Sequence, residues 1–204
     1  MNVKIPGPKD FIRYVWGLRL YLVVIIAIFV AFYILGYFAA MMMPGTGTYV
    51  VSDFKQEVTP LKSMSPLGLM LGIFLNNALK CLLVIVLGLA LGIAPALFML
   101  ANGLILGIVI GVTIRGTSLS YVLVGTIPHG VIEIPMVLIS SAIGLKLGVD
   151  LMLKLFRKKV SIGKEIREGL TMYFVYIMPL LLLAAIIETF VTGPLLYLLF
   201  GAHG

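Results

Sequence analysis

The chain has 204 residues, of which 61% are hydrophobic and only 11% are charged. A soluble domain carries roughly a quarter charged residues, so this composition excludes a soluble enzyme or binding module and indicates an integral membrane protein. The formal net charge of +7 does not indicate a nucleic-acid partner, because the basic residues lie beside the apolar segments, where they meet anionic lipid.

The first segment, residues 1–19, has apolar side chains at helical spacing. This pattern predicts an interfacial helix that leads into the first membrane span. The residues that share its apolar face are Phe11, Tyr14, Val15 and Leu18.

Five apolar segments follow, each of a length that crosses roughly 30 Å of hydrocarbon. Together they predict a single all-α, polytopic helical membrane domain over residues 1–204. The predicted spans are residues 20–43, 67–91, 95–114, 121–145 and 170–192. Gly193 and Pro194 are expected to break the last span, which leaves residues 195–200 as a short terminal piece.

Basic residues predict the orientation of these spans. Four precede the first span and seven lie in residues 146–169, whereas three lie beyond the opposite ends of the spans. The positive-inside rule therefore places the N-terminus and residues 146–169 in the cytoplasm. Five spans then place residues 44–66 and the C-terminus outside. The expected location is the cell membrane, where the lipid bilayer surrounds a multipass protein.

The fourth predicted span carries one charged residue, Glu133, near its middle. His129 precedes it by four residues, so both side chains share one helical face. Pro128 and Pro135 flank the pair and free backbone carbonyls of the preceding turns. Irregular backbone at membrane depth lies inside the protein or beside a wet cavity. This sequence therefore predicts a kinked helix beside a cavity.

Polar residues of two other spans fall at a similar depth. Counted at about 1.5 Å per residue, they form one layer between the midplane and the outer leaflet. Ionisable groups at that depth are costly unless they are paired, protonated or hydrated, which favours a shared ligand or ion pocket. A purely structural role, in which these groups cross-link helices, remains open. The residues of the predicted pocket are His129, Glu133, Glu188, Asn76, Asn77 and Lys80.

A metal site is the most specific form of this hypothesis. The imidazole of His129 and the carboxylates of Glu133 and Glu188 are suitable ligands for zinc or another divalent metal, with one position open for water. The order His-x3-Glu differs from the His-Glu-x2-His of zinc peptidases, and the other histidine, His203, lies in the C-terminal tail. A zinc hydrolase is therefore the weaker hypothesis, and a non-enzymatic role is favoured.

Gly103, Gly107 and Gly111 recur at intervals of four in the third span. Small residues at this spacing let two membrane helices approach closely. The neighbour can be another helix of the same chain or a second subunit. We expect a homodimer, because two-fold assemblies are the commonest oligomers.

Four motifs, taken together, resemble the stage II sporulation protein M family over about residues 66–195. The motifs are Phe74-Leu75-Asn76-Asn77, Ala101-Asn102-Gly103-x3-Gly107, Pro128-His129-Gly130-x2-Glu133-x-Pro135 and the late Glu188. The resemblance implies a five-helix membrane protein. It also implies a membrane or envelope protein partner, since sporulation members are thought to hold a peptidoglycan hydrolase complex at the membrane during engulfment.

Two functions of different classes fit these features. In the first, the protein is a membrane scaffold or partner subunit whose polar pocket binds a ligand or ion. In the second, the same pocket serves a metal- or proton-linked transporter or a zinc-dependent intramembrane hydrolase. Stoichiometric zinc that disappears in a Glu133→Gln variant would favour the second function.

Overall fold

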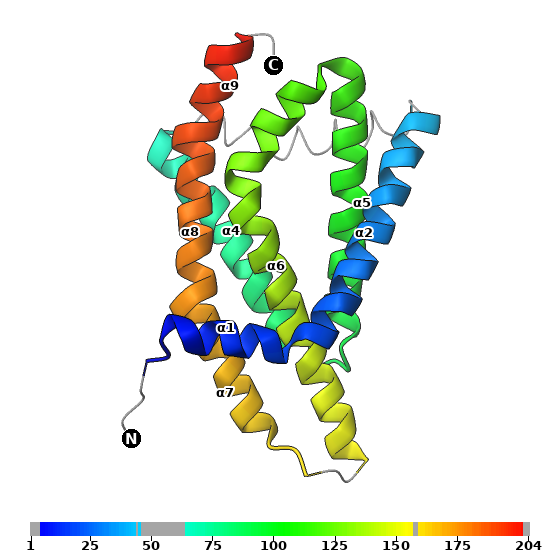
Figure 1. Ribbon diagram of the computed structural model, residues 1–204, viewed down its shortest axis with the longest axis vertical. Coiled ribbons are helices and arrows are strands. Elements are labelled where there is room, and N and C mark those ends of the chain that lie inside the picture. Colours follow the sequence, from blue (N-terminus) through cyan, green and yellow to red (C-terminus); the bar gives the residue numbers. More distant parts are fainter. Residues whose placement is uncertain (1–4, 44, 46–63, 157–158, 202–204) are drawn as a thin grey trace.

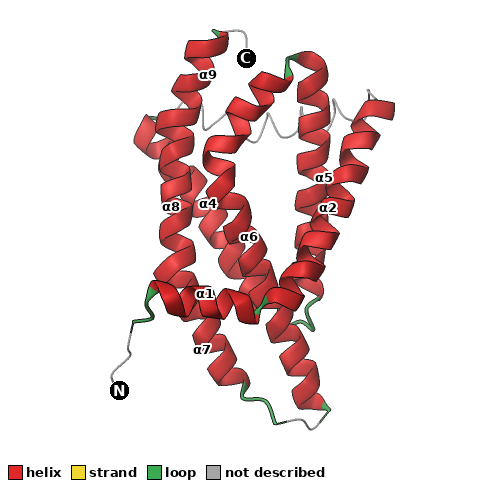
Figure 2. Ribbon diagram, viewed as in Figure 1, coloured by secondary structure: helices red, strands yellow, loops and turns green. Residues whose placement is uncertain are grey.

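The computed structural model describes residues 5–43, 45, 64–156 and 159–201 of the chain. Helices account for most of these residues, and none of them lies in a strand (Figure 2). Five helical segments among them are long and apolar enough to cross a membrane. The predicted all-α, polytopic fold is therefore confirmed. Most of the predicted outer segment 44–66, and the tail residue His203, lie outside the described residues.

The helices follow the predicted order from the interfacial segment to the C-terminal end (Figure 1). Their bounds are α1 Pro8–Gly17, α2 Arg19–Met42, α4 Pro66–Leu87, α5 Ile93–Gly116, α6 Leu119–Leu155, α7 Ile162–Met172, η1 Tyr173–Ile177, α8 Met178–Ile187, η2 Glu188–Thr192 and α9 Gly193–Phe200. The last five of these form one continuous helical segment, in which η1 and η2 are π-helical turns.

The last segment differs from the expected break at Gly193 and Pro194, because the helix continues through both residues to Phe200. A proline removes one backbone donor, and its ring crowds the carbonyl of the preceding turn. A π turn widens the helix by one residue and relieves that crowding. η1 ends two residues before Pro179, and η2 ends two residues before Pro194. Each proline is thus accommodated by a π turn.

The glycine ridge of α5 packs against α2. A Cβ atom at Gly107 would lie 2.1 Å from the carbonyl oxygen of Tyr33, and one at Gly103 would lie 2.4 Å from that of Phe29. At the end of the ridge, Arg115 donates to the carbonyl of Ala40 at 3.0 Å and so caps the last turn of α2. The close packing predicted for these glycines is therefore internal, and the ridge is not available to a second subunit.

A second close contact joins the turn between α4 and α5 to α6. A Cβ atom at Gly88 would lie 2.2 Å from the carbonyl oxygen of Gly144, and one at Gly148 would lie 2.1 Å from the backbone nitrogen of Gly92. Gly92 has a φ of 76°, which a residue with a Cβ atom rarely adopts. These glycines hold α6 at the centre of the bundle, where it contacts α2, α4, α5 and α8.

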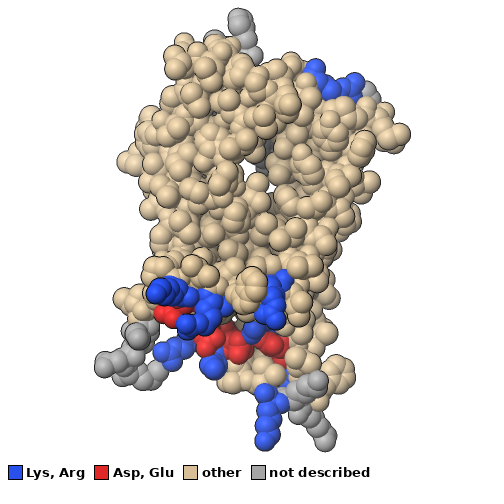
Figure 3. Space-filling view, viewed as in Figure 1, with Lys and Arg blue, Asp and Glu red and all other residues tan. Residues whose placement is uncertain are grey.

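Most of the charged residues that Figure 3 shows gather at one end of the molecule, beside α1, α7 and the last turns of α6, and a smaller basic group lies at the opposite end. At the first of these, the charged end, the ammonium of Lys146 donates to Asp150 at 2.7 Å and also to Glu165 of α7. All three side chains are at most 22% exposed. Burial and the nearby Glu165 raise the pKa of the Tyr14 hydroxyl above its usual value. α6 continues through this cluster to Leu155, ten residues beyond the predicted end of the fourth span at 145.

The helix α1 crosses this charged end as an amphipathic segment (Figure 1). Phe11 stacks on Tyr176 with ring centroids 4.5 Å apart, and Tyr176 donates to the carbonyl of Pro6 at 2.7 Å. On the opposite face, Ile12 and Trp16 are exposed. An apolar face turned away from the bundle at this level fits a helix that lies in the headgroup region.

The orientation in the membrane can be tested with two engineered cysteines in a Cys81→Ala background. Lys164 in α7 and Thr117 after α5 are both exposed and lie at opposite ends of the bundle (Figure 1). With the charged end in the cytoplasm, a membrane-impermeant maleimide is expected to label Thr117→Cys in intact cells. The Lys164→Cys variant should react only after permeabilisation. The opposite pattern would reverse the predicted orientation.

Candidate functional site

Three ionisable side chains from two distant segments converge inside the bundle. His129 and Glu133 lie one turn apart on α6, and Glu188 begins η2. One possible ligand atom from each residue lies within 4.8 Å of the others, and all three side chains are half-buried. The structure thus brings together the imidazole and the two carboxylates that the sequence offered as metal ligands.

Prolines and a π turn shape the backbone around these residues. Pro128 and Pro135 lie inside α6 without interrupting it, and the half of α6 farther from the charged end bends relative to the rest (Figure 1). Neither proline can donate to the carbonyl four residues earlier. Glu188 lies on a π turn, a feature that is common at functional sites. The irregular backbone therefore occurs on both segments that carry these three residues.

A threonine of η2 contacts the imidazole of His129. The Nδ1 atom of His129 lies 3.4 Å from the hydroxyl oxygen of Thr192, and the side chain of Thr192 is buried. A hydrogen bond from one ring nitrogen orients the imidazole and leaves the other nitrogen free to bind a metal. Thr192 is not among the residues that the sequence predicts for the pocket. Thr189 of the same π turn has a buried hydroxyl with no hydrogen-bond partner among the described residues.

The polar residues of α4 differ in their distance from the site. Asn77 lies close enough to interact with the carboxylate of Glu133, and the charge of Lys80 also acts on that carboxylate. Asn76 donates to the Asn77 side chain at 3.3 Å, but both Asn76 and Lys80 are exposed on the helix surface. Of the three predicted α4 residues, Asn77 lies at the site, whereas Asn76 and Lys80 lie at its outer edge.

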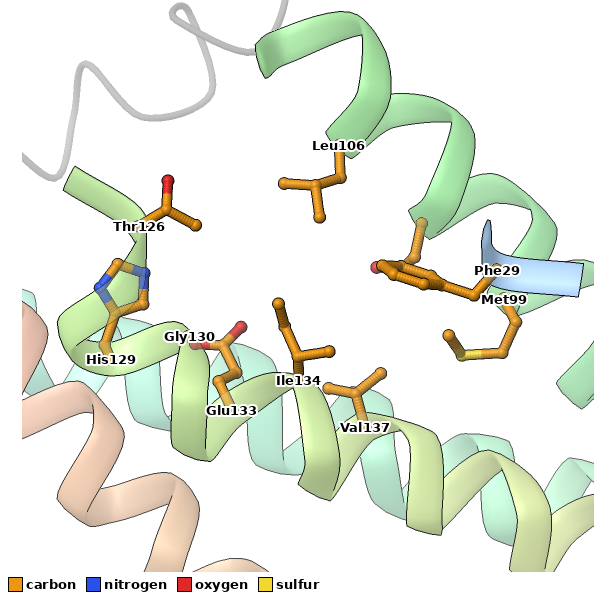
Figure 4. A pocket seen from close by; sticks show the side chains of 10 residues that line it. Phe29, Met99, Leu106, Thr126, His129, Gly130, Glu133, Ile134 and Val137 are labelled. Carbon is orange, nitrogen blue, oxygen red and sulfur yellow. The ribbon is translucent and has the colours of Figure 1, made fainter. Parts of the chain in front are cut away.

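A cavity of about 160 Å³ lies beside His129 and Glu133, between α6 and the α2–α5 pair. Its walls are mostly apolar, and Figure 4 shows Leu106 and Phe29 on the side facing Ile134. Two further residues add polar groups to these walls, Asn102 and Thr126, and neither is among the residues that the sequence predicts for the pocket. The side chain of Asn102 donates to the carbonyl of Phe98 at 2.7 Å.

The chain matches a family model described as stage II sporulation protein M over residues 25–193. This match includes His129, Glu133 and Glu188, the asparagines of α4 and the glycine ridge. No curated protein and no solved structure matches the chain.

Proposed function

The chain belongs to the stage II sporulation protein M family, and we propose that it is a membrane subunit that holds a divalent cation at His129, Glu133 and Glu188. The observation that carries this proposal is the convergence of three ligand atoms to within 4.8 Å of one another. In a tetrahedral zinc site with bonds of about 2.1 Å, the ligand atoms are about 3.4 Å apart. Small side-chain rotations would therefore complete three corners of the site.

The charges of the side chains around the site support a bound cation. Glu133 and Glu188 lie close together, and within a low-dielectric region two carboxylates repel strongly unless a proton or a cation neutralises them. Lys80 supplies a single positive charge from the edge of the site. A divalent ion between the carboxylates would balance both of them and would hold α6 to η2. Zinc is the first candidate, because it accepts imidazole and carboxylate ligands together.

A role as a partner subunit draws support from the outer surface of α4. Asn76 and Lys80 are exposed there within a membrane span, and such residues usually face protein rather than lipid. A neighbouring helix, from a second copy or from another membrane protein, would cover them. A homodimer remains a prediction, and its interface would be this surface, since α2 already covers the Gly103, Gly107 and Gly111 ridge.

Metal analysis tests the cation site. Protein purified in detergent, loaded with zinc and desalted is expected to retain about one zinc per chain, by mass spectrometry of the metal, because three protein ligands are provided. Glu133→Gln and Glu188→Gln should each lose most of that zinc, since each removes one charged ligand.

The matched control is Glu168→Gln, which changes an exposed carboxylate of α7. This variant should keep its zinc, and size-exclusion chromatography should give the same profile for all variants. Full zinc retention by Glu133→Gln, or a well-folded native protein without zinc, would refute the cation site. The carboxylates would then be neutralised by a shared proton.

A further inference from the structure

The cavity beside the proposed cation site lies next to a hollow in an apolar part of the surface. Figure 3, in the same view as Figure 1, shows the surface hollowed between α5 and α6 in the half away from the charged end. The exposed residues of these helices around that level are apolar, among them Ile105, Ile127 and Val131. A molecule that enters through this hollow would therefore come from the hydrocarbon region of the bilayer.

The cavity has apolar walls over most of its lining and ionisable side chains at one side. Leu106, Phe29, Ile134 and Val137 offer apolar surface, whereas His129 and Glu133 lie at one side (Figure 4). Binding sites with apolar walls and a few polar groups orient a ligand by its polar end. An occupant of this cavity thus needs an apolar chain and one polar head group.

The charges at the site define the head group further. A divalent cation with two ionised glutamates is neutral, and Lys80 acts on the same carboxylate with one positive charge. A head group with a single negative charge would restore neutrality in this low-dielectric region. Three protein ligands leave the fourth position of zinc open, and an oxygen donor can occupy it.

We propose that the cavity binds a membrane amphiphile whose singly negative oxygen-donor head group coordinates the cation. The simplest member of this class is a fatty acid. Its carboxylate would take the open position beside His129 and Glu133, and its chain would lie between Leu106 and Ile134. This inference rests on the proposed cation site and adds the class of ligand which that site recognises.

Cobalt-substituted protein in lipid nanodiscs provides the test, because visible d–d bands of Co²⁺ respond to a new oxygen ligand. Decanoate is expected to change these bands at concentrations at least tenfold lower than acetate. In Leu106→Trp, where the larger side chain fills the cavity, decanoate should bind at least tenfold more weakly. Its acetate response and its content of Co²⁺ should stay within about twofold of the native protein.

Ile105→Trp is the matched control, since Ile105 is the adjacent residue of α5 and is exposed on the helix surface. Decanoate partitions into the bilayer equally in both variants, so their comparison removes the effect of partitioning. Ile105→Trp should bind decanoate with an affinity within twofold of the native protein. Equal affinities for decanoate in Leu106→Trp and Ile105→Trp would overturn the amphiphile site while leaving the cation site intact. A native protein that binds no Co²⁺ would overturn both.

Discussion

Gly107→Ala is expected to lower the stability of the protein by about 3 kcal/mol, at the upper end of the usual cost of overpacking. The added Cβ atom would lie 2.1 Å from the carbonyl oxygen of Tyr33 and 2.8 Å from the backbone nitrogen of Tyr37. Both contacts are with backbone, so a side-chain rotation cannot relieve them. The helices α2 and α5 would have to separate, and the packing along the whole ridge would weaken.

Thermal unfolding in detergent measures this effect with a thiol-reactive dye. Cys81 is the single cysteine and is buried, so it becomes reactive as the bundle opens. The midpoint of Gly107→Ala should fall by about 6–12 °C. Gly116→Ala, at the end of the same helix, meets no atom within 4 Å and should leave the midpoint unchanged. Equal midpoints for the two variants would show that α2 and α5 do not pack this closely.

Lys146→Met is expected to cost about 2–3 kcal/mol, because it leaves Asp150 and Glu165 without their cation in a partly buried cluster. The loss of a fully buried pair costs more, and here the side chains of Lys146 and Glu165 are each 22% exposed. Methionine keeps much of the apolar length of the lysine, so the effect reports the charge. α7 should then loosen from the end of α6.

The same dye measurement should show a midpoint lower by about 4–12 °C. Lys164→Met removes a lysine of α7 that is 69% exposed and lies 3.7 Å from Glu168, and its midpoint should not change measurably. Adding Asp150→Asn to Lys146→Met should recover part of the loss, since one unpaired carboxylate is removed. A Lys146→Met variant as stable as Lys164→Met would contradict the buried cluster.

The membrane spans could be predicted from sequence because lipid tolerates only long apolar helices. Their ends were harder to predict. Lys146 marks the predicted end of the fourth span, whereas the helix itself continues to Leu155, past the ion pairs that Lys146 forms with Asp150 and Glu165. The spacing of Gly107 with its neighbours predicted a close helix contact, but spacing carries no information about the partner. The structure identifies that partner as α2.

The candidate site could be predicted in part, because the spacing of residues along one helix is visible in the sequence. His129 and Glu133 share a helical face by their spacing alone. The direction of Glu188 depends on η1, which precedes it. A π turn adds the equivalent of one residue and turns the following helix by about 100°. Glu188 could be placed in the predicted pocket by its depth, but no sequence pattern detects such a turn, so the direction of its side chain and the contact of Thr192 with His129 required the structure.

The pairing of α2 with α5 has a consequence for how the protein is made. The carbonyl of Ala40 accepts its hydrogen bond from Arg115, which is synthesised 75 residues later in the chain. At a synthesis rate of 5–20 residues per second, the delay is roughly 4–15 s. Both α2 and α4 are therefore synthesised before α5, the helix against which α2 packs in the folded protein.

The hydropathy of the spans fits this order of insertion. α2 has a mean hydropathy of 2.7, the highest of the five candidate spans, whereas α6 has the lowest at 1.8. A span that enters the bilayer alone has to be stable there by itself, and helices associate in a later stage. α6, which carries His129 and Glu133, emerges only after three spans are available to shield it. The span with the lowest mean hydropathy, α6, is thus synthesised after three of the helices that surround it in the folded protein.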